Sequence, residues 1–230
     1  MKSRIISFIV AAFMGLCLAV PVWADVYYGK SLAEWQGIYF SWYFGALNVP
    51  SDSNGNAVID NVVLLSMPST PGDGTPGYQK VTLSSGQPFV LPLFSLIGQR
   101  YKDGTEDPFN DVEIYQTVDL TVKVDGVTVI DSGNVMDYYS EYIFNPEIPY
   151  PYDPAVANIW VQNIGMVHSP FSFGQHTIQL DVKNTEPIPG LGTLEYHNTW
   201  AINAVPIPAA FWLFGTGLVG VVGIRRRFQK

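Results

Sequence analysis

The chain has 230 residues, of which 47% are hydrophobic and only 14% are charged, and its formal net charge is −8 at pH 7. Its central part, residues 25–204, contains six basic and all 20 acidic residues, a formal charge of −14. Such a surface repels nucleic acid and anionic lipid, so the composition excludes a nucleic-acid partner.

Residues 1–24 have the order of a secretory signal peptide. A positively charged start precedes an apolar run, and Val22-Trp23-Ala24 matches the small-residue pattern of a cleavage site. We predict cleavage by signal peptidase between Ala24 and Asp25, the alternative being an uncleaved signal anchor. Cys17, the only cysteine, lies in this segment, so the mature chain would have no disulfide.

The first predicted element of the mature chain is a helix. Ser31 and Glu34 have the spacing of a capping box, and Gly45 is a typical residue just beyond a helix end. Apolar residues recur at helical spacing on one face: Leu32, Trp35, Tyr39 and Trp42. We expect this aromatic face to be buried and the helix to lie across a sheet and close one end of it.

The remaining elements are predicted to be strands separated by turns. Nine segments are rich in β-branched and aromatic residues: 57–67, 80–83, 89–94, 118–124, 127–131, 139–144, 157–162, 176–183 and 193–202. The clearest hairpin turns at Asp125-Gly126, and Pro92 favours an edge position or a bend. This pattern predicts a mainly β fold, an antiparallel β-sandwich or jelly-roll-like single domain over residues 25–204 with one N-terminal helix.

The sequence contains no recognisable catalytic motif. A nucleophile elbow, a zinc-binding His-Glu-x-x-His pattern and a phosphate loop are all missing. The three histidines, His168, His176 and His197, do not have metal-ligand spacing within one element. We therefore expect a non-enzymatic protein. A glycan-active enzyme remains an alternative, because the separation of paired carboxylates cannot be read from sequence.

Two polar loops are candidates for calcium, the only cofactor considered. Oxygen-bearing side chains occupy positions 1, 3, 5 and 9 of a calcium-loop pattern at Asp52, Asn54, Asn56 and Asp60. Ala57 and Val63 stand where that pattern needs glycine and glutamate, so a plain Asn-Gly turn is the simpler interpretation. A second acidic loop contains Asp103, Glu106, Asp107 and Asp111.

Segment 137–154 concentrates tyrosines among acidic residues and prolines. Its candidates for binding a glycan or a protein are Tyr138, Tyr139, Tyr142, Tyr150 and Tyr152. Exposed tyrosines present flat apolar faces with a polar group, which suits stacking on sugars. The alternative is that the segment folds back and covers the core.

The last 26 residues, 205–230, combine a proline motif, an uncharged apolar stretch and a basic end. Residues 209–224 carry no charge, and at ~1.5 Å per residue they span roughly 24 Å of helix, somewhat less than a ~30 Å hydrocarbon core. We predict a transmembrane helix over about 209–224, with Trp212 at the outer interface. The basic stop, residues 225–230, would remain in the cytoplasm.

The order of these parts resembles the PEP-CTERM sorting signal of Gram-negative bacteria, in its Val-Pro-Leu-Pro-Ala variant. The residues that carry the resemblance are Val205, Pro206, Ile207, Pro208, Ala209, Ala210, Trp212, Arg225, Arg226 and Arg227. The resemblance implies transient anchoring in the inner membrane and cutting near the proline motif by an exosortase. It also implies a location at the cell surface or outside the cell and a link to exopolysaccharide or biofilm.

Four segments of the body carry a second resemblance: 29–35 with Trp42, 81–92, 120–126 and 173–178. They are similar to landmarks of a group of uncharacterised secreted bacterial proteins. Members of this group have a Trp-rich N-terminal helix and a β-sandwich body. The resemblance implies a fold and a secreted life, but no activity.

The sequence therefore predicts an exported, exosortase-sorted protein of the cell surface or extracellular matrix. Its expected partners are signal peptidase, the exosortase, the inner membrane and, as a further candidate, exopolysaccharide. One alternative is a glycan- or calcium-binding module, and another is a secreted glycan-active enzyme. If the tail stays uncut, the protein would be a single-pass inner-membrane protein with a periplasmic domain.

Overall fold

The computed structural model describes residues 26–68, 74–142, 148, 150, 152–184, 186–188 and 192–206. The predicted signal peptide, its cleavage site at Ala24 and Asp25, and the sorting signal from Ile207 onward lie outside these residues. Within the described ranges, no helix is both long enough and apolar enough to cross a membrane.

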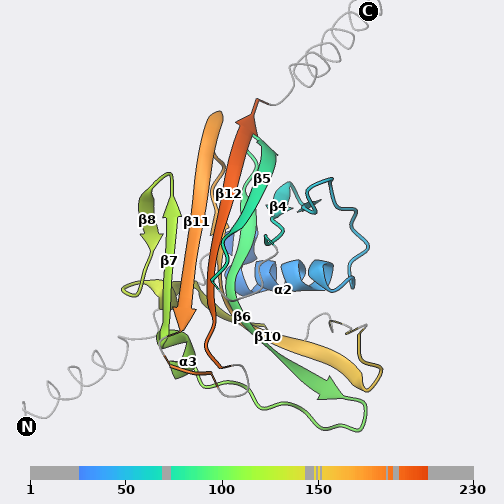
Figure 1. Cartoon of the computed structure of the whole chain (residues 1–230). Coiled ribbons are helices and arrows are strands. Elements are labelled where there is room, and N and C mark those ends of the chain that lie inside the picture. The colour runs from blue at the N-terminus through green and yellow to red at the C-terminus, as the bar shows by residue number, and fades with distance from the viewer. Residues whose placement is uncertain are drawn as a thin grey trace, which may run out of the picture.

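The described part of the chain is mainly β, with one long helix beside two five-stranded sheets (Figure 1). The helical elements are α2 (Leu32–Tyr43), α3 (Glu113–Gln116) and the 3-10 helix η1 (Val135–Tyr138). The strands are β1 (Val26–Tyr27), β2 (Lys30–Ser31), β3 (Ala57–Ile59), β4 (Val62–Leu64), β5 (Gly77–Ser84), β6 (Phe89–Tyr101), β7 (Val118–Val124), β8 (Val127–Ile130), β9 (Tyr139–Tyr142), β10 (Val156–His168), β11 (Gly174–Asn184) and β12 (Glu195–Val205).

The first sheet has the strand order β3-β4-β6-β10-β9, and the second has the order β5-β12-β11-β7-β8. Most neighbours are antiparallel, but β4 pairs with β6 and β5 pairs with β12 in parallel. The prediction of an antiparallel fold is therefore wrong for these two pairs. Apolar alternation indicates which face of a strand is buried, whereas strand direction depends on long connections that carry no turn signal.

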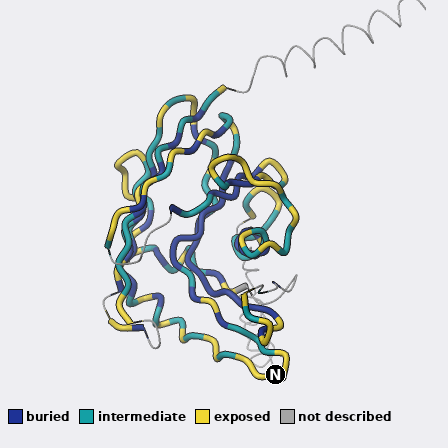
Figure 2. The backbone as a smooth tube through the Cα atoms, turned by 45° about the vertical axis from the view of Figure 1, so that its right-hand side comes forward, coloured by how far each residue is buried: buried dark blue, intermediate teal, exposed yellow. Residues whose placement is uncertain are grey.

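One hydrophobic cluster joins the two sheets. Leu91 of β6 and Ile164 of β10 contribute to it from the first sheet, and Leu120, Leu180 and Trp200 from the second, all fully buried. Figure 2 shows this buried backbone in the interior, with exposed residues at the loops and the outer surface. Burial of such side chains is worth about 1.5–3 kcal/mol each, so this cluster is a main source of stability.

Helix α2 begins at the predicted capping box. The Ser31 hydroxyl accepts a hydrogen bond from the Glu34 N–H at 3.3 Å, and the Glu34 carboxylate accepts one from the Ser31 N–H at 2.7 Å. The helix ends at Tyr43, and Gly45 follows with a positive φ of 77°, as expected for a residue beyond a helix end. The capping box and the helix end are confirmed.

The helix covers the outer face of the first sheet (Figure 1). Trp35 and Tyr39 are fully buried there in a second hydrophobic cluster with Val90, Ile159 and Val161. The expectation that the helix closes one end of a sheet is therefore wrong. Strands β6 and β10 are apolar on both faces, so the face turned away from the second sheet also needs a cover.

Two turns show how local sequence shapes the strands. The predicted strand 57–67 is instead the β3–β4 hairpin, which reverses at Asp60 and Asn61 with φ of 49° and 66°. The hairpin of β7 and β8 turns at Asp125-Gly126, as predicted, with φ of 51° and 79°. Asn and Asp tolerate this left-handed conformation better than most residues, which permits both turns.

Candidate functional site

The first predicted calcium loop uses its oxygen atoms within the protein. One Asp52 carboxylate oxygen accepts hydrogen bonds from the N–H groups of Asn54 at 2.8 Å and Asn56 at 2.9 Å. The Asn56 side-chain oxygen accepts from the Ser66 N–H at 3.0 Å. Asp60 lies in the β3–β4 turn and forms an ion pair with Lys30 at 2.7 Å. The arrangement is an Asx-type turn, whose acceptors already have partners.

The second acidic loop forms a small hairpin against the end of β6. Asp103 accepts hydrogen bonds from the N–H and hydroxyl of Thr105, and Glu106 forms an ion pair with Arg100 at 2.8 Å. The Asp107 carboxylate accepts from the Gln99 N–H at 2.9 Å. In the part of the chain that the structure describes, no group of three or more His, Cys, Asp or Glu side chains is arranged to hold a metal ion.

The candidate tyrosines lie on both sides of the first sheet. Tyr138 and Tyr139 pack against the cluster between the sheets, whereas Tyr150 packs against the cluster under α2. The side chain of Tyr142 is outside the described residues, and Tyr152 is 76% exposed. The rings of Tyr150 and Tyr152 contact each other on the helix side of the first sheet.

These two tyrosines continue an aromatic row that starts at the end of α2. The ring centres of Tyr152 and Tyr150 are 5.5 Å apart, those of Tyr150 and Phe44 are 6.0 Å apart, and those of Phe44 and Tyr43 are 5.1 Å apart. Tyr43 is 58% exposed, so both ends of this aromatic row (Tyr43, Phe44, Tyr150 and Tyr152) reach solvent. Sequence reasoning missed Tyr43 and Phe44, because the pattern of the helix gave no sign of a contact so distant along the chain.

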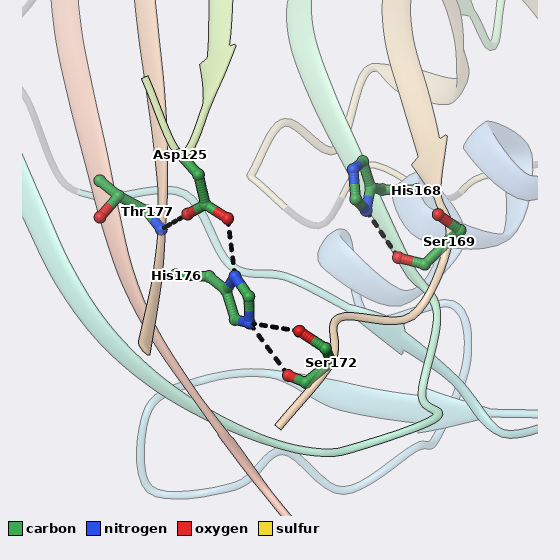
Figure 3. A network of polar contacts seen from close by, with 6 residues as sticks. All are labelled: Asp125, His168, Ser169, Ser172, His176 and Thr177. Carbon is green, nitrogen blue, oxygen red and sulfur yellow. Dashed lines mark hydrogen bonds and ion pairs between the residues drawn. The ribbon is translucent and has the colours of Figure 1, made fainter. Parts of the chain in front are cut away.

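A polar site around His176 joins the β7–β8 turn of the second sheet to β11 and to the loop that precedes β11 (Figure 3). The Nδ1 atom of His176 lies 2.7 Å from one oxygen of the Asp125 carboxylate. The other oxygen of this carboxylate accepts a hydrogen bond from the Thr177 N–H at 2.8 Å. The Nε2 atom of His176 lies 2.9 Å from the Ser172 carbonyl oxygen and 3.5 Å from the Ser172 hydroxyl. The left-handed turn at Asp125 brings the carboxylate to β11, so local turn geometry creates this contact.

The contacts around His176 resemble the order of a Ser-His-Asp triad, but its proton arrangement differs. A carboxylate and a carbonyl oxygen are both acceptors, so these two contacts favour the doubly protonated ring of His176. A triad histidine must instead accept the proton of the serine hydroxyl at Nε2. The hydrogen bond to Asp125 raises the pKa of His176 and outweighs the opposing effect of burial, which favours the charged ring.

The pKa of the second histidine in this region, His168, is shifted in the opposite direction. It stacks on Phe89 and Phe171 with ring centres 5.0 and 4.9 Å away, and Phe171 stacks on His176 at 4.4 Å. Burial lowers the pKa of His168, which favours its neutral form, and its Nδ1–H donates to the Ser169 carbonyl at 2.6 Å. Phe171, in the loop between β10 and β11, thus contacts two imidazoles whose pKa values are shifted in opposite directions.

We predict that this charged pair makes stability depend on pH. The folded-state pKa of His176 is raised, so its contribution is fully present below about pH 6.5 and is lost as the pH rises through the folded pKa. The pKa of His197, which is paired with Asp181 and Glu195, is also raised, so His197 likewise stabilises the fold more at low pH. The pKa of His168 is lowered, so His168 has the opposite effect on stability. Replacing His176→Gln should therefore lower Tm more at about pH 5.5 than at about pH 8.5.

The measurement is thermal unfolding of the protein and the variant across this pH range. Ser172→Ala keeps the backbone carbonyl and is the matched control, with no expected change in the pH profile. An equal loss of Tm at both pH values would show that the His176–Asp125 contact contributes by packing alone.

Comparisons of the chain with protein-family models, with curated proteins and with solved structures find no match.

Proposed function

We propose that the protein is exported and then sorted by an exosortase to the surface or extracellular matrix of a Gram-negative bacterium, where it acts without catalysing a reaction. The observation that carries this proposal is the order of residues 205–227: a proline motif, an uncharged stretch and three arginines. Signal peptidase, the exosortase and the inner membrane are its partners during export.

The end of the body is compatible with a cut at the proline motif. Strand β12 ends at Val205, where the last pair of the parallel β5–β12 ladder joins Val205 to Ser84. The Val205 carbonyl also accepts a hydrogen bond from the Ser85 N–H at 2.6 Å. A cut after Val205 removes no described strand, so we expect the body to keep its fold after sorting.

We infer that this body is a β-sandwich. The inference rests on the cluster that both five-stranded sheets share and on the cover that α2 provides for the outer face of the first sheet. A sandwich with many short loops is a common architecture of surface proteins, because it presents loops on a rigid frame.

The intact mass and terminal peptides of the protein from its native host test the proposed sorting. We expect a start at Asp25 and an end between Val205 and Ala209. The matched control changes Pro206 and Pro208 to Ala and should leave the tail uncut. An unaltered protein that starts at Asp25 and still ends at Lys230 would be a single-pass membrane protein, and the proposal would be wrong.

A second candidate function is glycan binding at the aromatic row. The observation that favours it is the contact of Tyr150 and Tyr152 with Phe44 and Tyr43, which extends the tyrosines into a larger aromatic surface. The Tyr150 and Tyr152 rings lie at 77° to each other, so the row is a bent surface rather than a flat platform. Such a surface can stack on one sugar ring while hydroxyl groups bind its edge.

We predict that changing Tyr150 and Tyr152 to Ala weakens binding to exopolysaccharide from the host by about tenfold, equivalent to roughly 1.4 kcal/mol. The reason is the loss of two aromatic faces at one site. Retention of the purified protein on immobilised polysaccharide measures the effect. Tyr78→Ala removes a tyrosine that is 60% exposed on β5 and should leave retention unchanged. Equal retention of the double variant and the control would contradict glycan binding at this row.

A further inference from the structure

Strand β6 has an open edge on the side that faces away from β10. At one end, β4 pairs with β6 only at Phe89 and Val90, and the Leu65 N–H donates to the Val90 carbonyl at 3.1 Å. At the other end, the Asp107 N–H donates to the Gln99 carbonyl at 2.8 Å. Between these points, residues 91–98 have no neighbouring strand on this side among the described residues.

The register with β10 shows which backbone groups point to the open side. Both backbone groups of Gln99 bind Asp107, so they face away from β10. The antiparallel register runs without a shift from Gln99 to Phe94, and the orientation of backbone groups alternates along such a strand. Ser95 and Ile97 therefore present their N–H and C=O groups to the open side, where no described residue pairs with them as a strand.

The orientation of the backbone is established only as far as Phe94, because the register with β10 shifts at Leu93. The Leu93 carbonyl accepts a hydrogen bond from the Tyr196 hydroxyl of β12 at 2.6 Å. Among the described residues, the stretch open to a further strand is therefore 95–97.

An apolar groove of about 220 Å³ lies beside this edge. Its walls are Tyr39, Phe40 and Tyr43 of α2, Met67, Tyr196 and the β6 residues Pro92, Leu93, Phe94, Ser95 and Ile97. Ile97 is 43% exposed, which is unusual for an isoleucine within a strand whose other apolar residues are mostly buried. The backbone groups of Ser95 and Ile97, which pair with no described strand, thus lie beside the apolar walls of the groove.

These features determine the chemistry of an occupant. Unpaired N–H and C=O groups at strand spacing fit an extended peptide backbone, and an apolar groove fits alternate apolar side chains of that peptide. Charge selects among peptides, because residues 25–204 carry a formal charge of −14. A second copy of the chain would bring the same excess of acidic residues and be repelled, whereas a basic peptide would be attracted.

We propose that the edge of β6 at Ser95 and Ile97 binds an extended basic peptide as an added strand, with apolar side chains of the peptide in the groove. This goes beyond the proposed sorting and does not depend on it. Ordinary strand addition obtains affinity from main-chain hydrogen bonds and specificity from pockets for alternate side chains. Here, Ser95 and Ile97 provide the hydrogen bonds, and Tyr43, Met67 and Tyr196 line the pocket.

The test is calorimetric titration of the purified protein with a synthetic peptide, acetyl-Lys-Val-Thr-Val-Lys-amide. A second peptide of the same sequence, with methyl groups on the two valine backbone nitrogens, cannot donate those hydrogen bonds. We expect the methylated peptide to bind at least about tenfold more weakly. A third peptide with Glu in place of Lys should also bind more weakly, because both partners are then acidic.

A pair of variants locates the site on the protein. Ser95→Pro removes a backbone N–H that faces the open side and leaves the ladder with β10 intact. It should therefore lower the affinity for the first peptide by about tenfold. Val127→Ala changes an exposed residue of β8, at the far edge of the second sheet, and should bind like the unaltered protein. If Ser95→Pro does not fold, the methylated peptide still decides the test on the unaltered protein.

Three results would overturn the proposal. Equal binding of the plain and methylated peptides would show that main-chain hydrogen bonds are not used. A folded Ser95→Pro protein with unaltered affinity would place the peptide elsewhere. Self-association that Ser95→Pro abolishes, without any peptide binding, would assign the edge to a second copy of the chain.

Discussion

Replacing Gly98→Ala is expected to lower the free energy of unfolding by about 3 kcal/mol. A Cβ atom at this position would lie 1.9 Å from Cζ2 and 2.0 Å from Cε2 of the Trp160 ring, far inside contact distance. Trp160 is only 1% exposed and packs against Phe109 with ring centres 4.6 Å apart, so the ring cannot move without displacing its neighbour. Overpacking of this kind forces shifts of side chains or backbone.

Urea unfolding measures this loss of stability. Ser95→Ala changes a half-buried residue of the same strand and is the control, with an expected effect within about 0.5 kcal/mol. Trp160→Leu should destabilise the native protein but cost less in the Gly98→Ala background, because the smaller side chain makes room for the methyl group. A loss below about 1 kcal/mol for Gly98→Ala would mean that the indole has room to move.

Replacing Asn163→Leu is expected to cost about 3 kcal/mol, because this side chain connects α2 to the first sheet. The Asn163 amide donates to the Gln36 side-chain oxygen at 2.8 Å, and its oxygen accepts from the Ser140 hydroxyl at 2.7 Å. Gln36 and Asn163 are at most 1% exposed. Leucine would leave both partners unpaired in the interior, which costs more than the two bonds contribute.

A triple variant separates the unpaired groups from the change in shape. With Gln36→Leu and Ser140→Ala added to Asn163→Leu, no unpaired partner of this network remains, so we expect higher stability than for Asn163→Leu alone. Asn203→Leu removes a hydrogen bond to Gln175 at the surface and should change stability by less than about 0.5 kcal/mol. If Asn163→Leu were as stable as the Asn203→Leu control, the proposed role of the network would be contradicted.

The Asn163 prediction concerns the layer between α2 and the first sheet, which also supports the candidate sites. The aromatic row begins at the last turn of α2, and the groove beside β6 lies between this helix and the strand edge. A destabilised helix would therefore disturb both glycan and peptide binding. Tyr152 is 76% exposed, so replacing it with Ala tests glycan binding with little effect on this layer.

The elements predicted correctly from sequence depend on neighbours along the chain. The capping box needs only Ser31 and Glu34, and the β7–β8 hairpin needs a residue that tolerates left-handed φ, such as Asp125, followed by glycine. The mainly β character follows from the same local information, since alternation and turn residues recur every few positions. The order of the proline motif, apolar stretch and arginines is likewise a property of the sequence alone.

The parallel pairs and both candidate surfaces depend on contacts between distant segments. Tyr150 meets Phe44, and Tyr196 reaches the Leu93 carbonyl, only after the sheets have formed. The ion pair of Asp60 with Lys30 likewise joins two segments that lie 30 residues apart in the sequence. Periodicity encodes which side of an element is apolar, but the partner is selected by packing of the whole domain. The proposed sorting signal rests on the order of residues in the sequence alone, whereas the tertiary structure decides which residues form the surfaces of the body.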